Sequence, residues 1–180
     1  PTSILPQVGV DVDHFAARQV RRDTPVMYIG RPVIEKGLGV LGAAWPSAVV
    51  LPWTPYSKLP WFMSRASIVV CPSIDTESWE EQAMPYVAAE AIACGAHVIA
   101  SDAGSIPFWA ERFAGINPGI RLVPQGNSAA LKQAIKDRLD MQGDSVFGGA
   151  AVVEAGRKWV VENLSSPVIA RRLYQCLAKL

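Results

Sequence analysis

Short apolar runs alternate with longer segments of helical periodicity, and this alternation constrains the fold more than any other feature of the sequence. Each run has four or five residues and contains Val or Ile. Such runs are typical of strands that are buried on both faces of a parallel sheet. The predicted strands are Val26–Gly30, Ala48–Leu51, Ile68–Cys71, His97–Ala100 and Ile120–Val123.

Between the runs, apolar residues recur at intervals of three and four, which predicts amphipathic helices. Strands that alternate with helices indicate βαβ units and a parallel sheet with both faces covered. We therefore expect an α/β fold with a doubly wound sheet of about five strands. The expected helices are residues 84–92, ending at Gly95; Leu131–Leu139, capped by Asn127 or Ser128; and residues 169–180, following Pro167.

All 180 residues are assigned to one domain, because a chain of this length builds one core and has little room for a second. Residues 1–24 are expected to form a linker segment, residues 143–151 a flexible connector and residues 164–180 a C-terminal helix. Ligands of doubly wound sheets bind beyond the carboxyl ends of the strands. The loops that follow the five strands are therefore the places to look for a site.

Composition excludes several classes of protein. With 50% hydrophobic and 18% charged residues, the chain is not intrinsically disordered. Its net charge of +1 gives no basic surplus for nucleic acid or anionic lipid. No stretch has the roughly 18 uninterrupted apolar residues of a transmembrane helix. The three cysteines lie in apolar segments, which predicts reduced core thiols and a cytoplasmic protein: Cys71, Cys94 and Cys176.

Three motifs resemble ligand sites but lack the required context. Residues 37–42 match G-x-G-x-x-G, yet the pattern begins seven positions after Gly30, and the next acidic residue is Asp75. A dinucleotide fingerprint needs its glycines directly after the strand and an acid about 20 residues on. The D-x-D of residues 11–13 precedes the first strand, so a turn is the favoured interpretation over a cation site. No metal ligands are assigned, since His14 and His97 lack a zinc-ligand spacing.

Arg31 and Lys36 stand just after the first predicted strand, in the sequence GRPVIEKG. Arg offers a planar fork of donors and Lys a compact ammonium, a combination suited to a diphosphate. The alternative is a pair of solvated loop cations with Glu35 as a local partner. Position alone does not decide between these two interpretations.

Four carboxylates crowd the loop after the third predicted strand, namely Asp75 and the three of the sequence ESWEEQ at residues 77–82, and Glu90 follows on the next helix. A carboxylate at that place accepts two hydroxyl hydrogen bonds, as from a ribose. For Glu77 and Glu80 we favour a solvated acidic loop that stabilises the helix N-terminus through the helix dipole.

Several of these segments together resemble a known family. They are GVDVDHF (residues 9–15), YIGRPVIEKG (28–37), CPS (71–73), EEQAMPYVAAEAIACGAHVIASDAGSIP (80–107) and LVPQGN (122–127). In this order they are similar to the nucleotide-sugar-binding half of GT-B glycosyltransferases, in the retaining group named glycosyl transferases group 1. The resemblance covers nearly the whole chain and implies a Rossmann-like domain that is one half of a GT-B fold.

The resemblance also implies roles for particular residues. The Arg and Lys of the family's G-R-x-x-x-E-K-G element bind the donor diphosphate, and Arg31 and Lys36 match them. The family's E-x7-E element places one acid near the sugar hydroxyls and the second on the ribose. Glu90 matches the second acid. For the first, Gln82 has the family spacing and Glu81 lies one position further back, so both remain candidates.

This sequence departs from the family pattern in two places. Ala83, Met84 and Pro85 replace the family's Phe-Gly, and a proline has no N–H to donate to a ligand; Ala83 and Met84 remain expected ligand contacts. Between Lys36 and Pro72 there is room for one strand–helix unit fewer, so we expect five strands, with Ala48–Leu51 beside Val26–Gly30. The loop after Leu51 would contact the base, and we expect Trp53 to stack on it, with plain packing as the alternative.

The main hypothesis is a donor-binding domain that transfers a hexose from a nucleoside diphosphate sugar with retention, without cofactor or obligatory metal. Arg31, Lys36 and Glu81 would be its catalytic residues. A GT-B enzyme has its active site between two domains, so an N-terminal acceptor domain is the expected partner, in cis or in trans. The chain alone would then be inactive, and membrane association would occur only through that other half. The alternatives are a non-catalytic nucleotide- or protein-binding relative and, on residues 37–42, a dinucleotide oxidoreductase domain.

Overall fold

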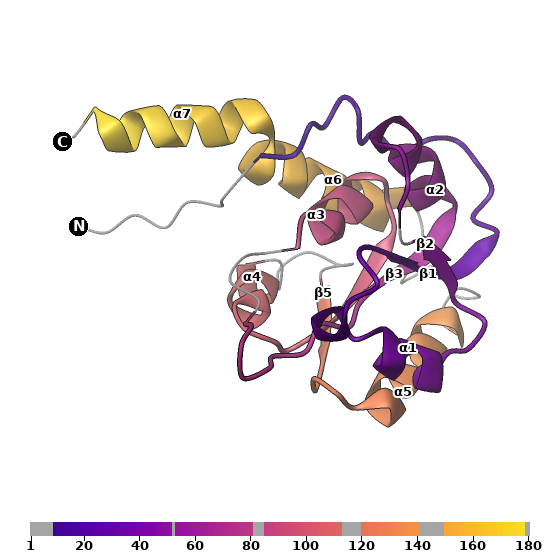
Figure 1. Ribbon diagram of the computed structural model, residues 1–180. Coiled ribbons are helices and arrows are strands. Elements are labelled where there is room, and N and C mark those ends of the chain that lie inside the picture. Colours follow the sequence, from indigo (N-terminus) through magenta and orange to yellow (C-terminus); the bar gives the residue numbers. More distant parts are fainter. Residues whose placement is uncertain (1–8, 52, 81–84, 113–119, 141–149, 179–180) are drawn as a thin grey trace.

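The computed structural model describes residues 9–51, 53–80, 85–112, 120–140 and 150–178. These residues form a five-stranded parallel sheet in the order β2-β1-β3-β4-β5, with helices on both faces (Figure 1). The predicted fold class and the placement of the second strand beside the first are confirmed. The strands are β1 (Thr24–Ile29), β2 (Val49–Leu51), β3 (Ala66–Cys71), β4 (His97–Ser101) and β5 (Ile120–Val123).

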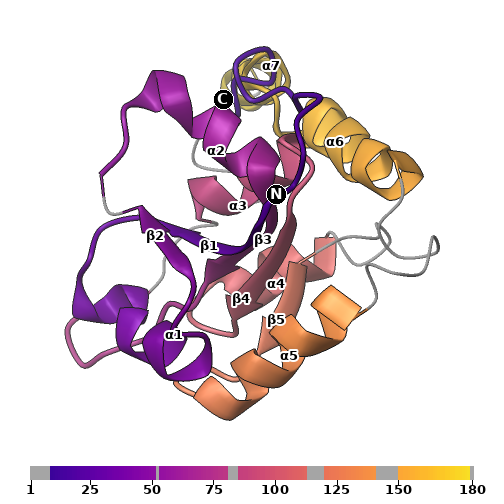
Figure 2. The ribbon, with the colours of Figure 1, turned by 90° about the vertical axis from the view of Figure 1, so that its right-hand side faces the viewer.

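Each strand is followed by a helix, and the helices cover the two faces of the sheet. In Figure 2, α2, α3 and α6 lie on one side of the sheet, and α1 and α5 on the other. The 3-10 helices are η1 (Ile34–Lys36) and η2 (Tyr56–Lys58). The α-helices are α1 (Leu38–Ala44), α2 (Leu59–Arg65), α3 (Tyr86–Ala93), α4 (Ile106–Arg112), α5 (Ser128–Asp140), α6 (Ala150–Leu164) and α7 (Ser166–Leu177).

Helix ends follow the signals in the sequence. Gly95 takes a left-handed φ of 81° just after α3, a conformation that side chains disfavour. Asn127 caps α5, since its Oδ1 accepts a hydrogen bond from the Ala130 N–H at 2.9 Å. Pro167 occupies the first turn of α7, where its missing N–H costs nothing. The structure therefore confirms the three expected ends, although Met84 lies outside the described residues.

Alternate strand residues build two hydrophobic cores, one on each face of the sheet. Met27, Val69 and Val98 pack with α3 and α6 on one face. Ile68 and Ile99 pack with α1 and α5 on the other. This alternation arises because successive side chains of a strand point to opposite faces. The expected burial is confirmed for β3 and β4, which are buried along their whole length, whereas β2, at the edge of the sheet, leaves Val49 and Val50 exposed.

Residues 9–15 are anchored to this body. The Arg157 guanidinium on α6 donates hydrogen bonds to the carbonyls of Phe15, Val12 and Ala93, at 3.1 to 3.2 Å. Phe15 is fully buried. One guanidinium therefore fixes both the N-terminal segment and the C-terminal end of α3, where the helix dipole favours a positive charge.

The cysteines fit the expectation in part. Cys71 and Cys94 are buried thiols of the core, whereas Cys176 on α7 is half-buried. All three are free. The prediction of a core position was therefore right for two of them.

Candidate functional site

The strand order reverses between β1 and β3, because the chain goes outward from β1 to β2 and then returns to the other side of β1. Val26 pairs with Ile68 and Met27 with Val69 across this central pair. The chain leaves β1 toward α1 on one face of the sheet and leaves β3 toward α3 on the other face. Ligands of open α/β sheets bind at such a switch point. The loop of Arg31 and Lys36 leaves β1 there.

Tyr28, a residue of β1, fixes the backbone of the loop that follows this strand. The phenol donates a hydrogen bond to the Arg31 carbonyl at 2.7 Å. Burial raises the pKa of Tyr28 to about 12, so the hydroxyl stays protonated and remains a donor. The Arg31 side chain itself is exposed at the edge of the sheet. A fixed backbone thus presents an exposed guanidinium.

The same loop is bound to the loop after β3. The Ile74 N–H donates to the Glu35 carbonyl at 2.9 Å. Gly37 ends η1 with a φ of 66°, and a Cβ at this position would collide with the Pro72 carbonyl oxygen. A glycine is therefore required here on two counts, conformation and space. These contacts hold Lys36, between Glu35 and Gly37, beside the loop that leads to α3.

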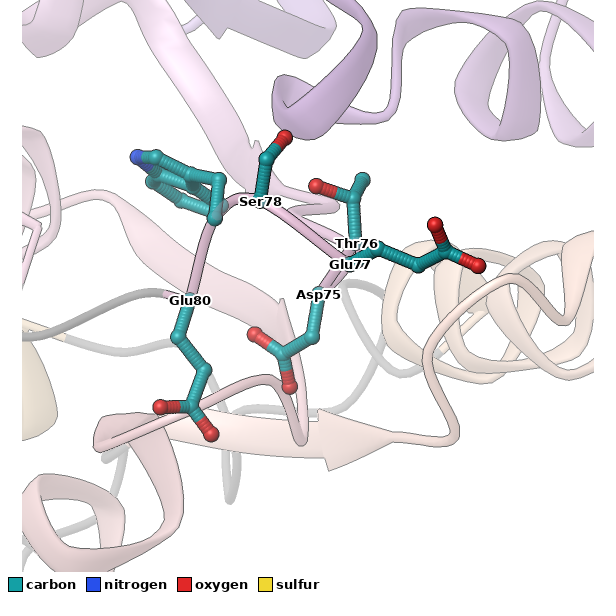
Figure 3. Close-up of a pocket in the computed structure, with 6 residues that line it drawn as sticks. Asp75, Thr76, Glu77, Ser78 and Glu80 are labelled. Atoms are coloured by element: carbon teal, nitrogen blue, oxygen red, sulfur yellow. The ribbon is translucent and has the colours of Figure 1, made fainter.

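The loop after β3 contains a tight hairpin that lines a cavity of about 450 Å³. Thr76 and Trp79 close the hairpin through two backbone hydrogen bonds, at 2.8 and 3.3 Å. Figure 3 shows the Asp75 and Glu80 carboxylates on one side of the hairpin and Glu77 pointing away. The Lys36 ammonium lies over the indole ring of Trp79, with its Nζ 4.7 Å from the ring centroid.

Three loops at this edge are joined by Gln125, which follows β5. Its side-chain amide accepts a hydrogen bond from the Asp75 N–H at 2.7 Å and donates to the Asp75 carboxylate at 3.1 Å. The Asp75 carboxylate also accepts the Gly104 N–H at 2.9 Å. The Gln125 N–H donates to Asp102 at 2.7 Å. The loops after β3, β4 and β5 therefore form one connected rim.

Glu90 lies on α3, in the second turn from the carboxyl edge. Burial raises the pKa of this carboxyl to about 7, so it is half protonated near neutral pH. Burial is the main cause that raises the pKa of the Tyr56 and Tyr86 phenols. The Glu90 charge raises the pKa of Tyr86 further, and the charges of Asp11 and then Glu90 do the same for Tyr56. Glu90 is thus a protonatable acceptor in a partly apolar, aromatic environment.

The predicted site residues fall on one edge of the sheet wherever the structure describes them. Arg31 and Lys36 share the loop after β1, Glu90 lies on the helix after β3, and Trp53 follows β2 with 82% of its surface exposed. The four remaining predicted residues lie outside the described residues: Glu81, Gln82, Ala83 and Met84.

Two features of the site were not predicted from the sequence: the contact of Trp79 with Lys36 and the bridge made by Gln125. In the sequence, Gln125 is part of the family segment LVPQGN and Trp79 is part of the acidic segment ESWEEQ, and neither was given a role of its own. A lone aromatic residue among four carboxylates was an available signal, but its partner is 43 positions away in the chain. Only the fold shows that the two lie together.

The other motifs have structural explanations. Gly39 and Gly42 lie in α1, where an added Cβ would meet nothing within 4 Å, so a dinucleotide fingerprint is ruled out. Asp11 stabilises a turn by accepting the His14 N–H at 3.0 Å. Among the residues described, no group of three or more His, Cys, Asp or Glu side chains is placed to hold a metal ion. Nor is any described helix both long and apolar enough to span a bilayer.

Together, the five-stranded parallel sheet and its strand order define a Rossmann-like domain of the kind that makes up half of a GT-B glycosyltransferase. The profile of the family "Glycosyl transferases group 1" matches residues 9–141. The chain belongs to this family. No curated protein sequence matches the chain.

Solved structures agree in fold. Sucrose-phosphate synthase from Thermosynechococcus elongatus superimposes with a TM-score of 0.74 at 20% identity, over 96% of this chain and 51% of that one. Anabaena HepE in complex with UDP gives 0.76 at 16% identity, over 96% of this chain and 56% of the other. The C-terminal domain of LpcC from Francisella tularensis gives 0.63 at 22%, over 87% and 99%. The chain spans about half the length of the first two relatives.

Proposed function

We propose that this chain is the donor-binding half of a retaining glycosyltransferase that moves a hexose from a nucleoside diphosphate sugar to an acceptor. One observation carries the proposal. At the switch point of the sheet, the loop of Arg31 and Lys36 is hydrogen-bonded to the loop that leads to α3 and Glu90. HepE, which has the same fold, has been solved with UDP and with UDP-glucose, and this supports a nucleotide sugar as the ligand.

In this proposal, Arg31 and Lys36 hold the diphosphate and stabilise the negative charge that develops as it leaves the sugar. Two cations take the place that a divalent metal has in other phosphate sites, so no metal is required. Glu90 accepts hydroxyl hydrogen bonds from the ribose. Glu81 or Gln82 contacts the sugar, and Trp53 stacks on the base.

Transfer requires a second domain, supplied in cis or in trans. Both reactants must be held in register and water must be excluded, which one wall of a cleft does not achieve. We therefore expect the 180-residue chain to bind a donor but to transfer sugar at a negligible rate.

The test is calorimetric titration of the folded chain with UDP, GDP, ADP and their glucose derivatives, with and without excess chelator. We expect one nucleotide family to bind best, with the same affinity when metal is removed. Binding that disappears with chelator would contradict the metal-free site. Failure of every nucleotide to bind would refute the donor-binding role.

A non-catalytic relative is the second candidate, favoured by one observation. Pro85 stands at the N-cap of α3, so this position has no backbone N–H to offer an anion at the start of the helix. Joining the chain to a GT-B N-terminal domain and assaying sugar transfer separates the two candidates. A complete protein that binds the donor tightly without transferring sugar would establish the second.

A further inference from the structure

Lys36 and Trp79 form a cation–π pair, and backbone contacts fix the loop on which each of the two residues lies. The Lys36 Nζ lies 4.7 Å from the centre of the indole ring, well inside the range of attraction. Lys36 is fixed by the contacts of Glu35 with Ile74 and of Gly37 with Pro72. The pair therefore joins two preformed loops.

Trp79 is presented by a hairpin that has little freedom to move. The hairpin is closed by the two hydrogen bonds between Thr76 and Trp79. Its first residue, Asp75, is bound to Gly104 and Gln125 on the neighbouring loops. The ring is half-buried, so its position is set by the rim of the sheet.

The chemistry of the pair suits anion binding. A lysine has a flexible four-carbon stem, and ordering it costs rotamer entropy. An aromatic face attracts the ammonium and adds no negative charge of its own, so it orders the lysine side chain without repelling a phosphate.

We propose that Trp79 is a positioning residue that holds the Lys36 ammonium ready for the diphosphate of the donor. This role rests on the donor-binding function proposed above. It assigns a task to the aromatic residue of the acidic loop, and Trp79 acts on the ligand only through Lys36.

The test compares Trp79→Leu with Trp79→Phe, using the nucleoside diphosphate that binds wild type best and the matching nucleoside, which lacks phosphates. We expect Trp79→Leu to weaken diphosphate binding about 3- to 30-fold and Trp79→Phe to weaken it less. Nucleoside binding, measured by NMR titration, should stay the same in both. Circular dichroism verifies folding, and Trp79→Phe retains the test if Trp79→Leu unfolds.

Two controls sharpen the result. Trp61→Leu removes another tryptophan that stacks on a cation, Arg65 at 4.4 Å, and should leave binding unchanged. In a Lys36→Met background, Trp79→Leu should have no further effect. The proposal is overturned if diphosphate binding is unaffected, if the nucleoside is weakened equally, or if the effect persists without Lys36. A wild-type chain that binds no diphosphate would instead refute the donor-binding function, and the role of Trp79 with it.

Discussion

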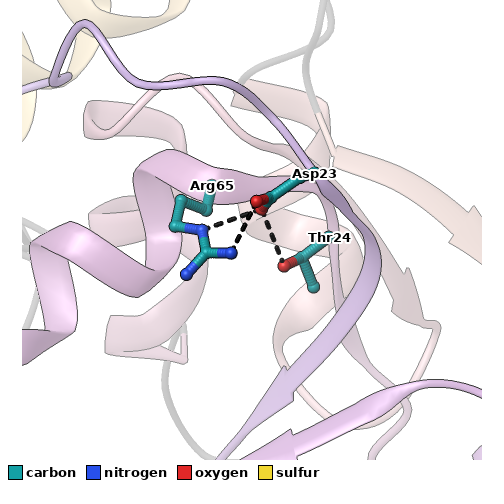
Figure 4. Close-up of polar contacts among 3 residues, drawn as sticks. All are labelled: Asp23, Thr24 and Arg65. Atoms are coloured by element: carbon teal, nitrogen blue, oxygen red, sulfur yellow. Dashed lines mark hydrogen bonds and ion pairs between the residues drawn. The ribbon is translucent and has the colours of Figure 1, made fainter.

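The two edges of the sheet use the same cationic residue types in opposite ways. At the amino edge, Arg65 makes two hydrogen bonds to the Asp23 carboxylate, at 2.8 and 2.5 Å (Figure 4). Arg22 donates to the carbonyls of Ala66 and Cys94, at 2.5 and 3.0 Å. At the carboxyl edge, Arg31 is exposed and Lys36 lies against an aromatic ring.

This difference teaches how to separate structural from functional charge. A guanidinium that donates to carbonyls or a carboxylate of its own chain stabilises the fold, and its position is fixed by those partners and not by a ligand. The amino edge also keeps His97 neutral: burial, with Arg138 and Arg22 nearby, lowers its pKa to about 3. Substitutions at the amino edge should therefore change stability, and substitutions at the carboxyl edge should change binding.

The largest expected effect is on binding at the carboxyl edge. Arg31→Ala combined with Lys36→Ala should weaken binding of the preferred nucleoside diphosphate by about 100-fold or more, because two charged hydrogen-bonding groups are lost. The free energy of unfolding should change by no more than about 0.5 kcal/mol. Calorimetry and urea denaturation measure the two quantities.

The matched control removes two exposed lysines of α5, with Lys132→Ala and Lys136→Ala. It changes the net charge by the same amount away from the site. Unchanged affinity in the folded Arg31/Lys36 variant, or an equal loss in the control, would remove the diphosphate assignment.

At the amino edge, Arg157→Met should lower the free energy of unfolding by about 3 kcal/mol, because three carbonyls lose a charged donor. The neighbouring Lys158→Met is the control, since Lys158 is exposed and makes only a long contact with Glu162, at 3.8 Å. Nucleotide affinity should be retained below the shifted melting temperature. Equal stability of the two variants would contradict the anchoring role of Arg157.

Glu90→Gln should remove a pH dependence of stability. The pKa of Glu90 is raised from 4.5 to about 7 in the folded chain, so the folded state binds more protons than the unfolded state between these values. Stability attributable to this group is therefore present below about pH 4.5 and lost as the pH rises through about 7. At pH 8 the variant should be more stable than wild type by about 2 to 3 kcal/mol, and at pH 4.5 about equal.

Denaturation curves at the two pH values measure this difference. Glu154→Gln, at an exposed position of α6, is the control and should change little at either pH. A wild-type chain whose free energy of unfolding does not fall between about pH 5 and about pH 8 would show that Glu90 is well solvated.

The smallest effect is expected for the ion pair of Asp23 and Arg65, which is solvent-exposed at the amino edge. Hydrogen bonding to Arg65 lowers the pKa of Asp23, so its contribution is present at neutral pH and lost as the pH falls through the folded value. Asp23→Asn should lower the melting temperature slightly at low salt and not at about 0.5 M salt, where the charges are screened. A decrease that persists at high salt would indicate a role beyond electrostatics.

Much of the fold was predictable because its signals are local. The five strands are apolar runs that need no partner to be recognised, and Gly95 and Asn127 mark helix ends through conformation and capping. By contrast, four helices were not predicted: α1 (Leu38–Ala44), α2 (Leu59–Arg65), α4 (Ile106–Arg112) and α6 (Ala150–Leu164). The helix α2 begins with Leu-Pro-Trp-Phe, whose apolar residues are adjacent, so it shows no clear interval of three or four.

The site was predictable in position and not in detail. Arg31 and Lys36 follow a strand directly, so their place at the carboxyl edge comes from chain order alone. The packing of α3 that raises the pKa of Glu90 depends on residues distant in sequence. So does the contact between Lys36 and Trp79.

By itself, the sequence determined the alternation of strand and helix, and with it the edge of the sheet where the loop cations stand. Periodicity and chain order are properties of residues that are close in the sequence, so they can be recognised without knowledge of the fold. Only the tertiary structure decided which cations donate hydrogen bonds to backbone carbonyls and which carboxyl group is buried away from solvent. It also decided which ring receives the Lys36 ammonium, because hydrogen bonding, desolvation and ring contacts depend on distances between segments far apart in the chain.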